Sequence, residues 1–436
     1  MKTVIMAGGK GTRIASVNAE VPKPMIPILG KPILEYQLEC LRAQGFTDVI
    51  LVVGHLGHVI RDYFGDGSGI SPATGQPFGV SIDYVVETEP LGTAGALYLL
   101  KDKLREDFLL LCGDVIFDVD VGRFCRFHQE RGGVATLFTH PNSHPYDSGI
   151  IMADDDGRVT NWLHREDERL WYRNRVNAGL HFLSPRIFDQ GLFRELKKVD
   201  LDREVLKPLI PTGQLFVYDS PEYVKDMGTP DRFYAVTEDI RSGKVHRKNL
   251  SNPQKCVFLD RDGTLNRYVG FLRSLDELEL LPGTAEAVRK INESGYLAIV
   301  VTNQPVIARG EVSVSQLREI HNKLETLLGQ EGAYLDAIYY CPHHPHRGYA
   351  GEIPELKIDC DCRKPKPGLL LQAARDFHID LKASYMVGDS DSDVQCGRNA
   401  GCTPIRLGGA PEEAGVARYD TLLDFVNDRF GREEQL

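Results

Sequence analysis

The stretch Cys256-Val257-Phe258-Leu259-Asp260-Arg261-Asp262-Gly263-Thr264-Leu265-Asn266 decides the fold class of this chain. Its apolar run has the length of a buried parallel strand, and two carboxylates one residue apart follow at once. Open α/β sheets hold ligands at the carboxyl ends of their strands, so both acids are expected at the mouth of a sheet. The two acids repel each other unless a cation lies between them, and Mg²⁺ bound through carboxylate and phosphate oxygens would remove that repulsion. Asp260 is then the candidate nucleophile toward phosphorus and Asp262 the candidate general acid/base; the alternative is a strand followed by an acidic turn.

The overall composition predicts an ordinary globular chain of two or three domains. It has 436 residues, of which 42% are hydrophobic and 26% charged, so sizeable cores are expected. The net charge of −11 argues against nucleic acid or an anionic membrane as a partner. No apolar stretch has the length of a membrane span. Nine scattered cysteines, an odd number, indicate reduced thiols and a cytoplasmic enzyme.

A second pattern of strand and loop lies near residue 1. The apolar run Thr3–Ala7 leads into Gly8-Gly9-Lys10-Gly11-Thr12-Arg13, and Pro22-Lys23-Pro24 holds a lysine on a rigid segment. Glycines let backbone amides approach phosphate oxygens closely, and the cations add positive charge. The glycine loop alone is equally compatible with a turn. Together with Pro-Lys-Pro it resembles the signature of the sugar-phosphate nucleotidyltransferases, which have a GT-A-like, Rossmann-related α/β fold with a mixed sheet.

This resemblance implies residues for a nucleotide and for Mg²⁺. Asp114, after the strand-like run Phe108–Cys112, and Asp226, before Gly-Thr-Pro, are implied as the ligands of the ion. A sugar 1-phosphate oxygen would attack the α-phosphorus in line and release pyrophosphate, with charge neutralised by the metal, Lys23 and Arg13. The nucleotide-binding residues implied are Gly8, Gly9, Gly11, Thr12, Arg13, Lys23, Gly92 and Thr93.

The sugar contacts are less well defined. Asn177 and Gly179 lie in a segment that resembles a strand lining the sugar pocket of that family. Many relatives carry Glu-Lys-Pro near the sugar, whereas this chain reads Trp162-Leu163-His164-Arg165-Glu166. Asn177 and Gly179 are therefore preferred over His164 and Arg165 as sugar-binding residues.

The composition changes after residue 242. Residues 1–242 are expected to form the nucleotidyltransferase domain, the polar and basic residues 243–254 a linker, and residues 255–436 a second domain. Three pieces follow the Asp260 motif in that second domain: Thr302-Asn303-Gln304 after a strand, Arg363-Lys364-Pro365-Lys366-Pro367-Gly368 before a helix, and Gly388-Asp389-Ser390-Asp391-Ser392-Asp393 after a last strand.

These four pieces, in this order, resemble the haloacid dehalogenase (HAD) phosphatases, whose domain is a Rossmann-like parallel sheet. The resemblance implies Asp260 as nucleophile and Asp262 as general acid/base. It implies Thr302 and Lys364 as the residues that hold the transferred phosphoryl group. Mg²⁺ would be bound by Asp260, Asp262 and Asp389, with Asp393 supporting that site.

A cysteine and histidine cluster precedes Lys364. Cys341-Pro342-His343-His344 and Cys360-Asp361-Cys362 supply three thiolates and one imidazole, which suit a closed structural zinc site formed by Cys341, His343, Cys360 and Cys362. His344 or His346 could replace His343, and free buried cysteines are the simpler alternative. The insertion resembles two HAD families, the heptose bisphosphate phosphatases and the histidinol-phosphatases. Substrate contacts are implied for Tyr268, Phe271, Asn303, Gln304 and Arg363, although Pro305-Val306 stands where the heptose family usually has Ser-Gly.

The two resemblances fit one reaction sequence. Removal of the 7-phosphate from heptose 1,7-bisphosphate leaves a heptose 1-phosphate, which is the kind of substrate that the first domain would couple to a nucleotide. In the pathway this resembles, GTP is the nucleotide and GDP-D-glycero-α-D-manno-heptose, used in bacterial surface glycans, is the product. Three alternatives stay open: mannose or glucose 1-phosphate with GTP, UTP or dTTP; a histidinol-phosphatase-like second domain; and a regulatory, non-catalytic first domain. A homo-oligomer is compatible with the sequence.

Overall fold

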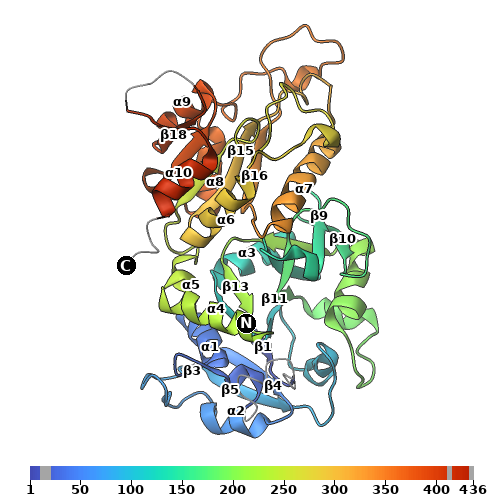
Figure 1. Cartoon of the computed structure of the whole chain (residues 1–436). Coiled ribbons are helices and arrows are strands. Elements are labelled where there is room, and N and C mark those ends of the chain that lie inside the picture. Colours follow the sequence, from blue (N-terminus) through green and yellow to red (C-terminus); the bar gives the residue numbers. More distant parts are fainter. Residues whose placement is uncertain (10–20, 410–414, 432–436) are drawn as a thin grey trace. The chain divides into compact units, whose positions relative to one another are not determined.

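The computed structural model describes residues 1–9, 21–409 and 415–431, which divide into two compact units (Figure 1). The first unit comprises Met1–His140, Ile151–Trp162 and Asn177–Asn249, and the second comprises Pro141–Ile150, Leu163–Val176 and Leu250–Leu436. Two short segments that precede residue 242 therefore fold with the second unit. The last boundary, between residues 249 and 250, falls inside the stretch expected to be a linker, where α5 (Lys244–Arg247) forms one helical turn. The domain limits at 242 and 255 stay a prediction.

The first unit is built on a mixed sheet, as the sequence predicted. In its described part nine strands pair in the order β10-β9-β11-β6-β1-β4-β5, with β8 joined to β11 and β12. The neighbours β6, β1, β4 and β5 are parallel, whereas β11 runs antiparallel to β6. The strands are β1 (Lys2–Met6), β4 (Asp48–Val53), β5 (Ser81–Val86), β6 (Phe108–Cys112), β8 (Ala135–His140), β9 (Ile150–Ala153), β10 (Val159–Leu163), β11 (Val176–Leu183) and β12 (Leu215–Asp219).

Smaller elements surround this sheet. Two antiparallel pairs are formed by β7 (Val115–Asp118) with β13 (Tyr223–Asp226), and by β2 (Pro27–Ile28) with β3 (Lys31–Pro32). The helices are α1 (Ile33–Ala43), α2 (Gly57–Phe64), α3 (Val121–Arg131), α4 (Pro230–Arg241), the 3-10 helices η2 (Lys23–Met25), η3 (Gly95–Leu100), η5 (Pro185–Gln190) and η7 (Lys207–Thr212), and the π-helix η6 (Leu201–Leu206).

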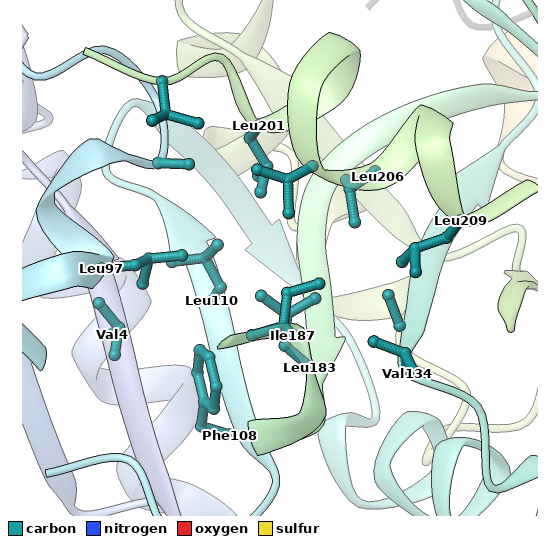
Figure 2. Close-up of a cluster of buried hydrophobic side chains, with 14 of the residues drawn as sticks. Val4, Leu97, Phe108, Leu110, Val134, Leu183, Ile187, Leu201, Leu206 and Leu209 are labelled. Atoms are coloured by element: carbon teal, nitrogen blue, oxygen red, sulfur yellow. The ribbon is translucent and has the colours of Figure 1, made fainter. Parts of the chain in front are cut away.

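Both faces of the first sheet are buried, which explains its continuous apolar strands. Val4 and Leu110 point to one face and pack with Leu97, Ile187 and Leu206 from helices η3, η5 and η6 (Figure 2). Their alternating neighbours point to the opposite face, where α1 and α3 contribute apolar side chains. Each fully buried Leu or Ile contributes roughly 1.5–3 kcal/mol to stability. This two-sided burial fixes the strand ends at which the candidate residues lie.

The second unit is built on a parallel sheet with the order β16-β15-β14-β17-β18-β19. Its strands are β14 (Cys256–Leu259), β15 (Leu297–Asn303), β16 (Ala337–Cys341), β17 (Tyr385–Gly388), β18 (Thr403–Leu407) and β19 (Ala417–Tyr419). Its helices are α6 (Thr284–Ser294), α7 (Val314–Gln330), α8 (Gly368–Phe377), α9 (Asp391–Ala400), α10 (Leu422–Phe430), and the short 3-10 helices η4 (Pro145–Asp147), η8 (Leu275–Glu277), η9 (Pro354–Leu356) and η10 (Leu381–Ala383).

The central strand β14 is buried on both faces. Val257 and Leu259 pack in a cluster with side chains of α6, α7 and α10, whereas Cys256 and Phe258 pack in a second cluster with side chains of α8 and α9. The side chains of a strand alternate between its two faces, so a strand covered by helices on both sides is apolar at every position. The strand order places β14 between β15 and β17, so that three motif-bearing strand ends are neighbours.

Residues 163–176 are held in the second unit by a buried charged group. The Arg175 side chain is 3% exposed, and its Nη1 lies 3.4 Å from Glu325 Oε2 on α7. Arg175 Nη2 also donates to Asp336 O (2.8 Å), and Asn174 N donates to Glu325 Oε2 (2.6 Å). These hydrogen bonds offset the cost of burying both charges. Within the described residues, no helix combines the length and apolar character needed to cross a membrane.

Candidate active sites

Asp260 and Lys364 meet at the carboxyl end of β14. Asp260 directly follows the strand, and its backbone N–H donates to Val387 O of β17 (2.9 Å). The Lys364 ammonium lies 2.8 Å from Asp260 Oδ1 and 2.6 Å from Asp393 Oδ1, and it donates to Val301 O (2.9 Å). Burial opposes the charge on Lys364, but the Asp260 and Asp393 carboxylates outweigh it and raise the pKa of the ammonium. A charged lysine is thus held beside the predicted nucleophile.

Three carboxylates gather at this point in an arrangement that suits a hard cation. Asp260, Asp389 and Asp393 each offer an oxygen, and these oxygens lie within 4.8 Å of one another. Carboxylate oxygens are the ligands that Mg²⁺ prefers, and octahedral ligands about 2.1 Å from the ion lie at most roughly 4.2 Å apart, so the donor set fits with small adjustments. Gly263 has φ +84°, and a Cβ there would overlap the Asp389 carboxylate. Glycine in the Asp-Gly-Thr motif is therefore required both by its backbone conformation and by the approach of Asp389.

The Asp262 carboxylate is directed to a different set of partners. It accepts hydrogen bonds from Arg261 Nε (3.1 Å) and Nη2 (2.8 Å), from Asn266 Nδ2 (3.0 Å) and from Gln304 Nε2 (3.0 Å). Burial alone would raise the pKa of Asp262, but the Arg261 guanidinium outweighs it and lowers that pKa. Asp262 is not a member of the three-carboxylate group, in which Asp393 lies beside Asp260 and Asp389. Its place as a magnesium ligand stays a prediction.

Arg261 is a residue that the sequence reasoning did not single out. Its side chain is fully buried and also approaches His321 (3.3 Å from Nη1 to Nε2). A buried guanidinium requires acceptors, and the acid that follows it in the motif provides them. The sequence signal that could have identified Arg261 is its position between the two acids of the motif, Asp260 and Asp262.

The Thr302-Asn303-Gln304 segment connects the end of β15 to both sides of the site. Gln304 Nε2 donates to Thr302 Oγ1 (2.9 Å) as well as to Asp262. Asn303 Nδ2 donates to Lys364 O (3.1 Å), and Lys364 N donates to Asn303 Oδ1 (3.0 Å). In this structure the Asn303 amide therefore positions the backbone that carries Lys364. The expected substrate contacts of Asn303 and Gln304 stay predictions.

The cysteine and histidine cluster is assembled at one point. The Sγ atoms of Cys341, Cys360 and Cys362 lie 3.2–3.5 Å apart, and His343 Nδ1 lies 3.3 Å from Cys362 Sγ. Thiolates about 2.3 Å from a tetrahedral zinc ion lie roughly 3.8 Å apart, close to the observed spacing. The structure thus contains a Cys₃His group that could hold a metal ion, with His343 as its histidine. His344 instead contacts the backbone oxygen of His346 (3.2 Å).

The remaining residues predicted for the second unit lie on loops. Arg363 Nη1 donates to His343 O (3.2 Å), which links the arginine before Lys364 to the loop of the Cys₃His group. Tyr268 and Phe271 are exposed, at 65% and 37%. The Arg309 guanidinium lies 4.3 Å from the Phe271 ring centroid, a cation–π contact that the sequence did not indicate.

In the first unit, Lys23 lies beside Asp114. Lys23 Nζ lies 2.5 Å from Asp114 Oδ2, and the lysine side chain is 10% exposed. The Asp114 loop is fixed by Gln37 of α1, whose Nε2 donates to Cys112 O (2.9 Å) and to Val115 O (2.6 Å). Gln37 is buried, and its position as a polar residue in the apolar stripe of α1 is a sequence signal for such a role. The predicted residues Gly11, Thr12 and Arg13 lie outside the described residues.

Asp226 is brought next to Asp114 by the pairing of β13 with β7. Asp226 is opposite Val115 in the register, and Met227 N donates to Asp114 O (3.0 Å). Arg232 Nη1 lies 2.7 Å from Asp226 Oδ2; burial opposes ionisation, but this guanidinium outweighs it and lowers the pKa of Asp226. Two carboxylates beside a lysine suit a magnesium ion together with phosphates.

The other predicted residues of the first unit are Gly8, Gly9, Gly92, Thr93, Asn177 and Gly179. Gly92 has φ +78°, and its backbone pairs with Val199 so closely that a Cβ would meet Val199 O at 2.5 Å. Thr93 Oγ1 accepts a hydrogen bond from Leu201 N (2.7 Å). Asn177 Oδ1 accepts from Gly179 N (3.2 Å). Gly8 lies next to Gly54 and Glu87, and a Cβ on Gly9 would meet no heavy atom within 4 Å.

Comparison with known proteins identifies both halves of the chain. The nucleotidyl transferase family matches residues 2–243, and a HAD-hydrolase-like family matches residues 361–416. A D-glycero-beta-D-manno-heptose-1,7-bisphosphate 7-phosphatase of Pasteurella multocida (strain Pm70) is 39% identical over 178 residues, which cover 40% of this chain and 94% of that protein. The protein of the same name from Salmonella typhi is 44% identical over 174 residues, covering 39% and 88%.

Two solved structures are also similar. HddC from Yersinia pseudotuberculosis, complexed with GMP-PN, is 26% identical with a TM-score of 0.46, covering 55% of this chain and 99% of that one. The D,D-heptose 1.7-bisphosphate phosphatase from B. bronchiseptica, complexed with magnesium and phosphate, is 34% identical with a TM-score of 0.35, covering 40% and 97%.

The fold, the sites and the sequence matches together define an enzyme in which a nucleotidyltransferase is joined to a HAD phosphatase. The chain belongs to the nucleotidyl transferase family, and its second half belongs to the D-glycero-beta-D-manno-heptose-1,7-bisphosphate 7-phosphatase family. Both predicted resemblances are thereby confirmed, as is the α/β fold class. The alternatives of a histidinol phosphatase and a non-catalytic first domain are not favoured.

Proposed function

We propose that the two halves catalyse consecutive reactions on one sugar. The second unit hydrolyses the 7-phosphate of D-glycero-D-manno-heptose 1,7-bisphosphate. The first unit transfers GMP from GTP to the resulting heptose 1-phosphate, which gives GDP-heptose and pyrophosphate. The names of the relatives of the second half support the first substrate. The family of the first half supports the second reaction, because a sugar 1-phosphate is what a sugar nucleotidyltransferase consumes.

The observation that supports phosphatase chemistry most strongly is the Lys364 ammonium between Asp260 and Asp393. In the first step an Asp260 oxygen attacks the phosphorus, the bond from phosphorus to the sugar oxygen breaks, and that oxygen takes a proton from Asp262. In the second step a water oxygen attacks the phosphorus and gives a proton to Asp262, while the bond to Asp260 breaks and phosphate leaves. Lys364 and Thr302 hold the transferred phosphoryl group.

The protonation of Asp262 alternates between these steps. Arg261 lowers the pKa of Asp262, which suits the second step, because an ionised carboxylate can accept the proton of the attacking water. A bound phosphate dianion acts in the opposite direction and favours the protonated form that the first step needs. Tyr268, Phe271 and Arg363 are proposed to contact the sugar or its second phosphate from the loops above the strand ends.

For nucleotidyl transfer, the predicted roles all concern charge and position. Lys23 neutralises phosphate charge beside Asp114 and Asp226, and an oxygen of the heptose 1-phosphate attacks the α-phosphorus of GTP as pyrophosphate leaves. The covalent change requires no protein nucleophile. Gly92 and Thr93 are proposed to border the base, and Asn177 and Gly179 the sugar.

The proposed metals follow from the donor sets. Mg²⁺ would be held by Asp114 and Asp226 in the first unit and by the carboxylates around Asp260 in the second, and it would supply neutralisation of phosphate charge. Zinc held by the Cys₃His group would fix the loop that leads to Arg363 and Lys364. All nine cysteines are free of disulfides, and the nucleoside triphosphate substrate is intracellular, so we propose a cytoplasmic location.

The direct test is incubation of the full chain with heptose 1,7-bisphosphate, GTP and Mg²⁺. We expect release of phosphate, together with pyrophosphate and GDP-heptose in amounts equal to each other. A panel of both heptose anomers, mannose 1-phosphate and glucose 1-phosphate against the four nucleoside triphosphates identifies the acceptor and the base. Release of phosphate from histidinol phosphate but not from the heptose would show that the assigned pathway is wrong.

A further inference from the structure

Asp202 connects the proposed base-binding loop and the proposed sugar-binding strand of the transferase site. Its carboxylate belongs to none of the sequence motifs and has no role in the chemistry proposed above. It lies in the first turn of η6. The residues just before it, Val199 and Leu201, make the backbone contacts with Gly92 and Thr93 described above. The Asp202 carboxylate itself reaches Asn177, whose Nδ2 lies 3.3 Å from Asp202 Oδ1. One short segment therefore joins the proposed base-binding loop to the proposed sugar-binding strand.

The orientation of the Asn177 amide is determined by its other neighbours. Gly179 N–H can only donate, so the atom that it faces, 3.2 Å away, must be Asn177 Oδ1. His181 Nε2 lies 3.0 Å from the same oxygen, and burial lowers the pKa of His181 to about 4, so its neutral ring donates from Nε2. The Asn177 amide nitrogen consequently faces Asp202. This network holds the Asp202 carboxylate in a defined direction.

Asp202 also lies near the acids proposed to bind magnesium. Burial first, and then the charges of Asp114, Asp202 and Asp226, raise the pKa of the Cys112 thiol, so all three acids are within electrostatic range of one side chain. Among the described residues, however, these three acids do not form a group whose oxygens lie within 4.8 Å of one another. This argues against Asp202 as a third ligand of the same ion.

We propose that Asp202 is a specificity-determining residue of the transferase site, which accepts a hydrogen bond from a hydroxyl group of the sugar 1-phosphate. This inference rests on the proposed function of the first unit. Within the described part of the chain, the Asn177 amide is the one hydrogen-bond partner of the Asp202 carboxylate. A carboxylate has about four acceptor positions, so most of its capacity is available to hydroxyl donors. Burial, followed by the charge of Asp200, raises the pKa of Asp202 to about 6, and a hydroxyl donor would offset this cost.

The test compares Asp202→Ala and Asp202→Asn with the control Asp200→Asn. Asp200 is an exposed neighbour whose side chain caps η6 by accepting from Arg203 N (2.9 Å), a role that asparagine preserves. With the sugar 1-phosphate that the native protein uses best, we expect Asp202→Ala to raise KM for the sugar about 10- to 100-fold. KM for the nucleoside triphosphate, the Mg²⁺ dependence and the phosphatase activity should stay within about twofold. Asp202→Asn should recover part of the loss, because its amide oxygen still accepts a hydrogen bond.

Deoxy sugars separate a direct contact from a structural role. The deoxy analogue of the sugar 1-phosphate that lacks the contacted hydroxyl should have a raised KM with the native protein. Asp202→Ala should not raise the KM for that analogue further. The inference is overturned if Asp202→Ala leaves KM for the sugar unchanged. It is also overturned if Asp202→Ala raises the KM for every deoxy sugar, the KM for the nucleotide and the Mg²⁺ requirement by the same factor, which would indicate loss of structure. If the native protein transfers a nucleotide to no sugar 1-phosphate, the proposed function itself fails, and the inference fails with it.

Discussion

Replacing Lys364 with methionine removes the ammonium group that lies 2.8 Å from Asp260 and 2.6 Å from Asp393 but keeps the length of the side chain. The side chains of Lys364, Asp260 and Asp393 are 2%, 13% and 0% exposed, so water cannot replace the lost cation. Breaking a buried ion pair in this way costs about 3–5 kcal/mol, because the remaining carboxylates repel each other in a poorly solvated site. We also expect kcat for phosphate release to fall by about 10²–10³ or more, because phosphate charge is no longer neutralised.

Hydrogen–deuterium exchange of the peptides that contain β14 and β15 measures the loss of folding stability in the second unit separately from the first. A loss of about 3 kcal/mol corresponds to exchange that is about 100-fold faster. The double variant Lys364→Met with Asp393→Asn should exchange more slowly than the single variant, since one repelling charge is removed. Lys366→Met is the control, because Lys366 pairs with Asp359 in solvent and should be neutral in both assays. Unchanged exchange in Lys364→Met, or additive damage in the double variant, would refute the reasoning.

Four further outcomes are expected. Asp114→Asn should abolish nucleotidyl transfer and leave phosphatase activity intact in a coupled assay, and loss of both would argue against independent sites. Asp260→Asn should release no phosphate while its zinc content, measured by atomic absorption, stays near one ion per chain. Cys360→Ser should lower that zinc content and reduce phosphatase activity at least about tenfold, since the loop before Lys364 loses its anchor; full activity without metal would contradict a structural zinc site. The pKa of His181 is about 4 in the folded protein and 6.5 in the unfolded chain. The neutral ring therefore contributes to the free energy of unfolding in full above pH 6.5, and about 3 kcal/mol of this contribution is lost as the pH falls toward 4. Denaturant titrations of the native protein and of His181→Gln should diverge in that pH range.

The joining of the two enzymes in one chain has a simple chemical reason in the proposed function. Hydrolysis of the 7-phosphate is practically irreversible, whereas nucleotidyl transfer with release of pyrophosphate is close to balanced. A phosphatase that supplies the acceptor at a fixed ratio to the transferase would keep the second reaction moving forward. Mixing Asp114→Asn with Asp260→Asn in equal amounts should restore GDP-heptose formation if the intermediate diffuses freely between molecules.

Local patterns in the sequence were sufficient to locate the strands and the helix that carry the main motifs. The strand-like run Phe108–Cys112 is β6, the apolar run before Asp260 is β14, and the helix expected after the Arg363–Gly368 segment is α8. These elements were predictable because strand alternation and helical periodicity record which side chains are buried. The segment that the sequence left as a linker contains α5, a single turn too short to show a period.

Which side chains meet across the chain was decided only by the tertiary structure. The sequence by itself determined that Asp260 and Asp389 each end a strand, because each follows its own apolar run, and the resemblance implied that Asp393 supports their site; that β14 and β17 are neighbours came from the tertiary structure. The sequence could not show that Arg261 holds Asp262, or that residues 163–176 fold against α7. These pairings depend on distances between residues far apart in the sequence and on the need of each buried charge for a counter-charge. A local sequence pattern contains neither kind of information.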